Sequence, residues 1–407
     1  MIAVERLDLR GEGVAGDLRI ARALPGEVVE GEAQDGRIAA PRIVTPSPDR
    51  VRAPCPHYRA CGGCALMHAS DAFVAAWKVQ VVERALAGQG LEALFAPMHT
   101  SPPGTRRRAV LAGRRLKRGA LVGFHGRASD TVTAIPDCRL LHPDLMAALP
   151  VLEEVTGLGA PRGRALALTV TRSDAGVDLA VRGGKALDGP LRAALGALAG
   201  RAGLARLAWD GEVIALAAPP AQIFGRAQVV PPPGAFLQAT EDGEAALLAA
   251  VRGAVGEAAR VADLFAGCGT FALPLAERAE VHAVEGDAAM VDALDAGWRR
   301  APGLKRVSTE ARDLFRRPLL ADELARFDAV VIDPPRAGAA AQVAELGRAR
   351  VPEIAALSCN PVTFARDART LVTAGYRLQT VQVVDQFRWS AHVELAARFV
   401  FGHIAQQ

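Results

Sequence analysis

Short apolar runs alternate with longer mixed segments from about residue 226 to the carboxyl terminus. The runs at residues 261–265, 281–284, 329–332 and 354–357 have the character of buried strands, and residues 271–278 begin a helix. Strands that alternate with helices in this way predict an α/β domain with a parallel sheet. Open sheets of this kind bind their ligands beyond the carboxyl ends of the strands. The residues that follow each apolar run are therefore the candidate site.

Residues 101–129 combine apolar stretches with a concentration of positive charge. The apolar stretches at 109–111 and 121–124 predict two strands joined by a basic turn. The segment contains eight basic residues and no acidic residue. A charged hairpin can serve only to protect a sheet edge from aggregation. The excess charge favours instead a surface that faces a polyanion, where phosphate contacts position a nucleic acid without specifying its sequence.

Composition narrows the class of protein. A chain of 407 residues is long enough for two or three domains with cores of their own. Half of the residues are hydrophobic, yet no run approaches the ~20 apolar residues of a membrane span. The first residues lack the charged and apolar regions of a signal peptide. We therefore expect a cytoplasmic protein without membrane contact, and a monomer.

Four of the six cysteines fall in the amino-terminal half. Cys55, Cys61 and Cys64 form a C-x5-C-x2-C cluster, and Cys138 follows the basic hairpin. In a cytoplasmic chain such a cluster is more typical of metal binding than of disulfides. Four thiolates suit either a tetrahedral zinc ion or an iron–sulfur cluster. The arrangement of three cysteines plus one favours a [4Fe–4S] cluster.

The turn after the first apolar run has the composition of a nucleoside-binding loop. It contains Gly267 and Gly269, and the next strand ends at Glu285, where a carboxylate can bind ribose hydroxyls. The turn lacks the third glycine of a dinucleotide-binding loop, which favours S-adenosylmethionine over NAD. Asp313, after a third strand-like stretch, is placed either to meet the adenine or to cap a helix. Cys268, inside the turn, is expected to be structural.

The last two apolar runs end in Asp333 and Cys359. An Asn-Pro pair follows Cys359 and predicts a helix that opens near Val362. A thiol beside a helix amino terminus is expected to have a lowered pKa. Glu394 lies in an apolar stretch near the carboxyl terminus, where burial raises the pKa of a carboxyl group into a range that suits proton transfer.

Together these motifs resemble the S-adenosylmethionine-dependent RNA uracil-C5 methyltransferases, specifically the iron–sulfur branch that makes 5-methyluridine in 23S ribosomal RNA. The resemblance covers nearly the whole chain, and the combination of motifs is specific although each motif alone is not. The matching blocks are the segment 55–64 with Cys138, Asp-Leu-Phe-Ala-Gly-Cys-Gly-Thr at 263–270, Asp-Pro-Pro-Arg at 333–336, Ser-Cys-Asn-Pro at 358–361 and His-Val-Glu at 392–394.

The resemblance implies an α/β architecture of three parts. A Rossmann-like class I methyltransferase domain would occupy residues 226–407. An α+β central RNA-binding domain with the [4Fe–4S] site would occupy residues 51–225, and a trimmed β-barrel residues 1–50. The first 50 residues are short for that barrel and contain more acidic than basic residues. We therefore expect weakened contact between the barrel and RNA.

The resemblance also implies roles for individual residues. Cys359 would be the nucleophile and Glu394 the general base. The implied cofactor contacts are Gln238, Phe265, Thr270, Glu285, Asp313 and Asp333. The implied ligands of the [4Fe–4S] cluster are Cys55, Cys61, Cys64 and Cys138.

The expected chemistry explains why a thiol and a carboxylate are both needed. Uracil C5 is too weak a nucleophile to take a methyl group directly. Addition of the Cys359 thiolate to C6 makes an enolate whose C5 can attack the methyl sulfonium, and Glu394 then removes the C5 proton. The target base must leave its stack to reach the site. The cluster is expected to have a structural role.

Three alternatives remain at this point. The same reaction on transfer RNA uses the same catalytic residues. An adenine-N6 methyltransferase would use the acidic-Pro-Pro block, but it leaves Cys359 and Glu394 without a role. A non-catalytic iron–sulfur RNA-binding protein would explain the cysteines and the basic hairpin, but not the cofactor loop or the nucleophile. The sequence does not indicate which uridine is modified.

Overall fold

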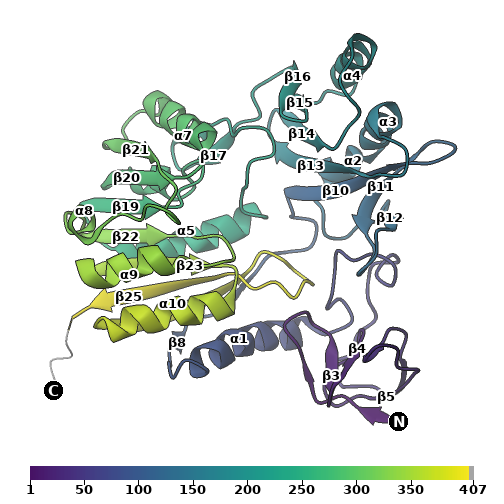
Figure 1. The fold of residues 1–407 in the computed structure, drawn as a ribbon, viewed down its shortest axis with the longest axis horizontal. Helices are drawn as coiled ribbons and strands as arrows, with labels where there is room; N and C mark the ends of the chain where they lie inside the picture. Colours follow the sequence, from purple (N-terminus) through teal and green to yellow (C-terminus); the bar gives the residue numbers. More distant parts are fainter. Residues whose placement is uncertain (403–407) are drawn as a thin grey trace.

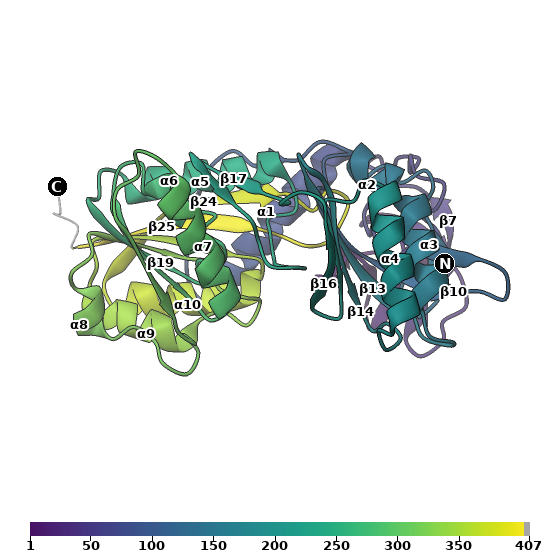
Figure 2. The same ribbon diagram turned by 90° about the horizontal axis from the view of Figure 1, so that it is seen from above.

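The computed structural model describes residues 1–402 (Figure 1). A large sheet with helices on both faces forms one side of the molecule, and a second sheet with helices on one face forms the other side (Figure 2). Two small sheets at the amino terminus lie beside the second sheet (Figure 1). Among residues 1–402, no helix has the length and apolar character to cross a membrane.

The large sheet has nine strands. Its order is β21-β20-β19-β22-β23-β25-β24-β8, and β9 also pairs with β24. Strands β19 to β23 are parallel, whereas β25 is antiparallel to both of its neighbours. The main strands are β19 (Arg260–Leu264), β20 (Glu280–Glu285), β21 (Val307–Ala311), β22 (Ala329–Ile332), β23 (Glu353–Ser358), β24 (Tyr376–Asp385) and β25 (Leu395–Phe401). The predicted parallel sheet is confirmed, because the four apolar runs correspond to β19, β20, β22 and β23.

Helices cover both faces of this sheet, so its strands are apolar on both sides. One face packs against α5 (Glu241–Val255), α6 (Ala272–Leu275) and α7 (Ala288–Arg300). The other face packs against α8 (Ala321–Leu324), α9 (Ala340–Ala349), α10 (Pro361–Thr373) and α1 (Asp71–Ala87). The helix predicted at 271–278 is therefore present, but α6 is shorter than expected.

A segment of the amino-terminal half completes the large sheet. Strands β8 (Leu94–Phe95) and β9 (His99–Thr100) both pair with β24. Helix α1 buries Trp77 and Val82 in the same apolar core as α10. Residues 71–100 therefore pack with the large sheet, so the expected boundary near residue 225 does not separate two independent packing units.

The second sheet has the order β12-β11-β10-β13-β14-β15-β16. Its core lies beneath α3 (Leu149–Gly159) and α4 (Gly189–Arg201). Its strands are β10 (Arg108–Arg115), β11 (Ala120–His125), β12 (Val132–Ala134), β13 (Leu166–Ser173), β14 (Gly176–Arg182), β15 (Arg206–Trp209) and β16 (Glu212–Leu216). The predicted basic hairpin is confirmed as the antiparallel pair β10–β11. Its tip projects away from the large sheet in both views (Figures 1 and 2).

The amino-terminal strands form two small sheets, β1-β5-β7 and β2-β3-β4-β6. They surround a small apolar core of Val4, Ile20, Ala23, Val29 and Ile38. The strands are β1 (Ile2–Ala3), β2 (Arg6–Leu7), β3 (Gly13–Ala15), β4 (Leu18–Ile20), β5 (Val28–Glu30), β6 (Arg37–Ile38) and β7 (Arg42–Thr45). Two connecting elements lie elsewhere, the helix α2 (Pro143–Ala147) and the hairpin of β17 (Gln222–Phe224) with β18 (Ala227–Val229).

Candidate active site

A cavity of 470 Å³ lies at the carboxyl ends of β19, β20, β22 and β23. Parallel strands present their carboxyl ends at one edge of a sheet, which is where ligands bind in open α/β folds. The structure brings all eight expected cofactor and catalytic residues to this cavity. They are Gln238, Phe265, Thr270, Glu285, Asp313, Asp333, Cys359 and Glu394.

The Gly-rich turn is fixed to the end of the neighbouring strand by Glu285. The Gly267 amide donates a 3.0 Å hydrogen bond to Glu285 Oε2, while the Gly286 and Asp287 amides donate to Oε1. Gly267 has a φ of +57°, and Phe265 before it has a φ of +63°, which is uncommon for a residue with a Cβ. The turn is thus held in a strained shape with its backbone facing the cavity.

Two other residues of the turn pack into the core on the α6 and α7 side of the sheet. Gly269 has a φ of +94°, and a Cβ there would lie 2.8 Å from Leu273 and Leu294. Cys268 is only 2% exposed, and burial raises the pKa of its thiol to about 12. A neutral, buried thiol agrees with the structural role expected for Cys268.

The position of Asp313 bears on both alternatives that the sequence left open. Its Oδ1 accepts hydrogen bonds from the amides of Phe315 and Arg316, at 2.9 and 3.3 Å, so it caps the turn that follows β21. It also lines the cavity. The half-exposed ring of Phe315 lies beside it, 5.4 Å from the ring of Phe265. The sequence analysis did not single out Phe315, although an exposed aromatic residue next to a candidate adenine contact is a recognisable signal.

Cys359 occupies the turn between β23 and α10. The predicted helix is confirmed, because Asn360 caps α10 by accepting a 3.1 Å hydrogen bond from the Val362 amide. The expected lowering of the thiol pKa is wrong. Burial, and then the carboxyl groups of Glu394 and Asp333, raise the pKa of Cys359 to about 11, against an opposing effect of the Arg336 guanidinium.

Glu394 is 4% exposed and lies just before β25. Burial, and then the charge of Asp333, raise the pKa of Glu394 well above its ordinary value, in the direction expected from its apolar setting. Burial also raises the pKa of Asp333 to about 7. The Gln386 side chain donates a 3.4 Å hydrogen bond to Glu394 Oε2. Gln386 is not among the residues predicted from the sequence, because no local motif marks it.

A second, larger cavity opens on the other side of Cys359. This cleft of 1080 Å³ lies between the amino-terminal sheets, the segment 62–65 and the loops around Cys359 and His392. Cys359 and Arg336 line both the cleft and the smaller cavity. The thiol therefore lies where two openings meet, one of nucleoside size and one large enough for a segment of polymer.

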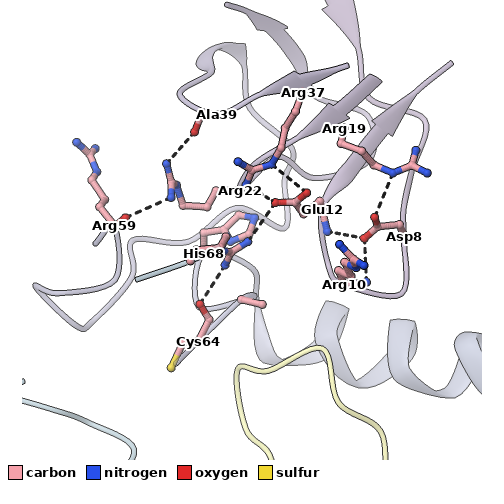
Figure 3. A network of polar contacts seen from close by, with 12 residues as sticks. Asp8, Arg10, Glu12, Arg19, Arg22, Arg37, Ala39, Arg59, Cys64 and His68 are labelled. Atoms are coloured by element: carbon pink, nitrogen blue, oxygen red, sulfur yellow. Dashed lines mark hydrogen bonds and ion pairs between the residues drawn. The ribbon is translucent and has the colours of Figure 1, made fainter. Parts of the chain in front are cut away.

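Arginines of the amino-terminal sheets line the wall of the cleft. Figure 3 shows Arg37 bound to Glu12, with an Nη2–Oε1 distance of 2.6 Å, and Arg19 paired with Asp8 at 3.3 Å. Arg10 also lines the cleft and is exposed. The carboxyl groups of Asp8, Glu12 and Asp35 line the same wall and match the charges of Arg10, Arg19 and Arg37. Further positive charge beside Cys359 comes from Arg127 and Arg336.

Arg127 connects the cleft wall to the cysteine segment. Its Nη1 lies 3.7 Å from Glu12 Oε1, and its Nη2 donates a 3.1 Å hydrogen bond to the Cys64 carbonyl oxygen. Three of the other basic residues in the 101–129 segment face inward. The Arg106 guanidinium lies over the ring of Phe387, 5.8 Å from its centroid. Arg107 is buried against Glu244, and Arg108 donates to the Ala235 carbonyl. The basic residues of this segment that can face a polyanion are therefore those at the hairpin tip, residues 114–118, and Arg127.

The four amino-terminal cysteines line one small cavity with apolar walls. The Gly63 amide donates a 3.3 Å hydrogen bond to Cys61 Sγ. Burial, and then the three neighbouring thiols, raise the pKa of Cys64 to about 12, so removal of its proton requires a positive partner. The four thiols, and their position around one cavity, are the kind of donor set that a metal centre needs. Within residues 1–402, however, no three His, Cys, Asp or Glu side chains lie close enough to hold one metal ion, so the expected ligand set is not confirmed.

Comparison with known proteins gives the fold and the family. Residues 234–399 match the family model described as tRNA (uracil-5-)-methyltransferase. The crystal structure of the Pyrococcus abyssi tRNA (uracil-54, C5)-methyltransferase with S-adenosyl-L-homocysteine has a TM-score of 0.74, with 22% identity, over 98% of this chain and 99% of that one. The expected class I methyltransferase fold is therefore confirmed.

Two relatives are similar along their whole length. An uncharacterized RNA methyltransferase of Brucella suis is 44% identical over 97% of this chain and 96% of its own. The 23S rRNA (uracil(1939)-C(5))-methyltransferase RlmD of Halomonas elongata is 35% identical over 97% of this chain and 88% of its own. With the nucleoside-sized cavity of the large sheet, these matches show that the chain belongs to the S-adenosylmethionine-dependent RNA uracil-C5 methyltransferases.

Proposed function

We propose that this enzyme methylates C5 of a uridine in 23S ribosomal RNA through a covalent bond between Cys359 and uracil C6. The observation that carries the proposal is the position of Cys359 between the 470 Å³ cavity and the 1080 Å³ cleft. A cofactor in the smaller cavity and an RNA base entering from the cleft would meet at this thiol. Glu394 lines the smaller cavity and is the carboxyl group available for proton transfer.

Each step follows from the groups at this junction. Cys359 Sγ bonds to C6, and the C5=C6 electrons move onto the C4 carbonyl oxygen. S-adenosylmethionine, when bound, supplies an electrophilic methyl group on a cationic sulfur. The C4 carbonyl re-forms as C5 takes this methyl group, whose bond to sulfur breaks, so that neutral S-adenosylhomocysteine is the leaving group. Glu394 then takes the C5 proton, the C–H electrons restore the C5=C6 bond, and the Cys359 thiolate leaves.

The charges around Cys359 explain how the thiol becomes reactive. Burial and two carboxyl groups oppose ionisation of the thiol, whereas the Arg336 guanidinium and a backbone N–H favour it. A cationic cofactor next to Asp333 adds positive charge at this point, and a nearby positive charge lowers a thiol pKa. The thiolate thus forms when the cofactor is present.

RNA entry is assigned to the cleft lined by Arg10, Arg19, Arg37 and Arg127. Planar guanidinium groups suit phosphate oxygens, and a flipped base is the general solution for chemistry on nucleobases. The amino-terminal sheets therefore contribute to RNA binding, together with the exposed hairpin tip. This assignment makes the first 50 residues a binding domain.

The choice of 23S ribosomal RNA rests on the similarity to the Halomonas RlmD enzyme. Mapping 5-methyluridine in ribosomal and transfer RNA from a deletion strain tests it. Loss of one 5-methyluridine from 23S ribosomal RNA, restored by the wild-type gene and not by a Cys359→Ala gene, is the expected result. Loss confined to transfer RNA would instead establish the alternative substrate.

We also propose that Cys55, Cys61, Cys64 and Cys138 hold a [4Fe–4S] cluster of structural role. Four converging thiols, apolar walls and the N–H bond to Cys61 support this donor set. The Arg106 guanidinium interacts electrostatically with Cys64 and Cys138 and offsets their negative charge. Anaerobic purification should give about four iron and four sulfide per chain. Stoichiometric zinc without iron would contradict the cluster.

A further inference from the structure

Gln386 lies between the candidate base and the candidate cofactor contacts. It follows β24 directly and is 1% exposed. Its Nε2 lies 3.4 Å from Glu394 Oε2 and 2.5 Å from Gln238 Oε1. Its Oε1 lies 2.6 Å from the Ala239 amide nitrogen. One side chain therefore contacts both halves of the site.

The backbone fixes which way the Gln386 amide points. The Ala239 N–H can only donate, so the group that faces it must be the Gln386 oxygen. Both Nε2 hydrogens then point toward the Gln238 oxygen and the Glu394 carboxylate. All polar groups of the Gln386 side chain are thereby satisfied, which favours a single orientation for this buried amide.

The chain of oriented amides continues to Asp333. Because Gln238 Oε1 accepts from Gln386, its Nε2 faces outward and lies 3.4 Å from Asp333 Oδ2. The two carboxyl groups at the ends of this chain thus each face an N–H donor. The chain joins the end of β22 to the loop before β25 without a charged group in between.

Packing holds Gln386 in this position. A Cβ on Gly243, in the first turn of α5, would lie 2.7 Å from Gln386 Cβ, so only glycine fits there. The residue before Gln386 is Asp385, whose buried carboxylate bonds to the Lys78 ammonium. Gln386 is thus fixed from two sides and does not need a ligand to become ordered.

We propose that Gln386 is a positioning residue that holds the Glu394 carboxylate and Gln238 in one hydrogen-bonded unit, so that the proton acceptor and the cofactor site are aligned together. This inference rests on the base role of Glu394 in the proposed function. The groups that face Glu394 in the described chain are the Asp333 carboxyl and the Cys359 thiol, with Arg336 acting on the thiol. The Gln386 amide is the donor that favours the ionised form of Glu394.

The test compares Gln386→Leu with Gln342→Leu, in the full-length protein. Gln342 is a matched control. It lies in α9, away from the site, is also 1% exposed, and forms hydrogen bonds through both amide atoms with the backbone of Leu319. Gln386→Asn serves as a second variant that keeps a polar side chain if the leucine variant does not fold. Folding is checked by circular dichroism and by the midpoint of urea unfolding.

Three readouts separate positioning from a structural role. In Gln386→Leu, the acidic limb of the kcat–pH profile should move up by about one pH unit, because a hydrogen bond that favours the carboxylate is lost. The value of kcat should fall about 10- to 100-fold. Because proton removal is slowed after methylation, a covalent protein–RNA adduct should accumulate with ordinary uridine RNA and be visible on a denaturing gel.

The outcomes are distinct. Gln342→Leu should retain wild-type kcat per folded molecule, the wild-type acidic limb and no adduct. If Gln386→Leu has the same acidic limb as wild type and accumulates no adduct, the residue is merely structural and the inference is overturned. If the wild-type enzyme itself makes no 5-methyluridine, the proposed function fails, and the inference falls with it.

Discussion

The Lys78 ammonium lies 2.6 Å from Asp385 Oδ1, and both side chains are almost completely buried. This ion pair joins α1 to the end of β24, one residue before Gln386. Removing one partner leaves an uncompensated buried charge, so Lys78→Met should lower the free energy of unfolding by about 3–5 kcal/mol. Urea titration measures this loss.

The double variant Lys78→Met with Asp385→Leu is the control for the buried pair. It removes both charges and should recover most of the lost stability, since replacement of a buried pair by apolar side chains is often neutral. Equal losses in the single and double variants would show that shape, and not charge, explains the effect.

Cys359 should react slowly with iodoacetamide at neutral pH in the ligand-free protein. Burial and two neighbouring carboxyl groups raise its pKa to about 11, and only the thiolate reacts. The alkylation rate, followed by mass spectrometry of the peptide that contains Cys359, should rise about tenfold per pH unit up to about pH 9.5. A plateau near the ordinary cysteine pKa, about 8.5, would contradict this environment.

The same alkylation measurement on Arg336→Gln tests which charge lowers the pKa of Cys359. Arg336 is the nearby group that lowers the pKa of Cys359. Its removal should therefore slow alkylation further at every pH below the plateau, with no change in fold. A faster reaction in Arg336→Gln would mean that the guanidinium shields the thiol instead of stabilising the thiolate.

Asp333→Asn should stabilise the protein without cofactor at about pH 8 by roughly 4 kcal/mol. Burial raises the pKa of Asp333 to about 7. Between its ordinary pKa and about 7 the folded chain holds a proton that the unfolded chain has released, so stability falls as pH rises through this window. Near pH 4 the variant and wild type should unfold at nearly equal urea concentrations.

The same variant should lose cofactor affinity although it gains stability. Asp333 lines the cofactor cavity, so Asp333→Asn should bind S-adenosylhomocysteine more weakly in calorimetry even where it is more stable. Lower stability of the variant at about pH 8 would contradict the destabilising effect of the buried carboxylate. Ligand binding as tight as in wild type would contradict the cofactor contact of Asp333.

Arg10→Ala and Arg19→Ala should each weaken RNA binding without affecting cofactor binding. Both residues line the cleft beside Cys359. Each lost phosphate contact should reduce the slope of log affinity against log salt by about one. The control is Arg192→Ala on α4, an exposed arginine that pairs with Glu212 away from the cleft. An unchanged salt slope in both cleft variants would place the RNA elsewhere.

The sequence predicted the parts of the fold in which local pattern and tertiary role agree. Strands β19, β20, β22 and β23 are buried on both faces, so each is a nearly continuous apolar run. The cap at Asn360 and the start of α10 follow from an Asn-Pro pair. Residues at the strand ends converge because parallel strands share an edge, and the structure brings the predicted residues to one cavity.

The features of the site that could not be predicted from the sequence depend on residues that are distant along the chain. The pKa of Cys359 has the opposite direction from the expectation because topology brings Asp333 and Glu394 beside it. Gln386 has no local signal, since its partner Gln238 lies 148 residues away. Arg107 is one of the basic residues expected to face a polyanion, but it is paired with Glu244, 137 residues away.

The same reasoning applies to the division into domains. Helix α1 has a mixed apolar pattern that predicts burial but not the sheet against which it packs. Pairing of β8 with β24 joins residues nearly 300 positions apart, as Leu94 with Thr380. Only the three-dimensional arrangement assigns residues 71–100 to the large sheet.

The covalent role of Cys359 is the central claim, and RNA that contains 5-fluorouridine tests it most directly. Fluorine at C5 cannot leave as a proton, so Glu394 cannot complete the reaction and the bond between Cys359 and C6 persists. With S-adenosylmethionine present, the wild-type protein should form an adduct stable on a denaturing gel, with the mass of the methylated RNA on the Cys359 peptide. Cys359→Ala should bind the RNA and form none. A wild-type protein that binds this RNA and the cofactor but forms no adduct would contradict the mechanism.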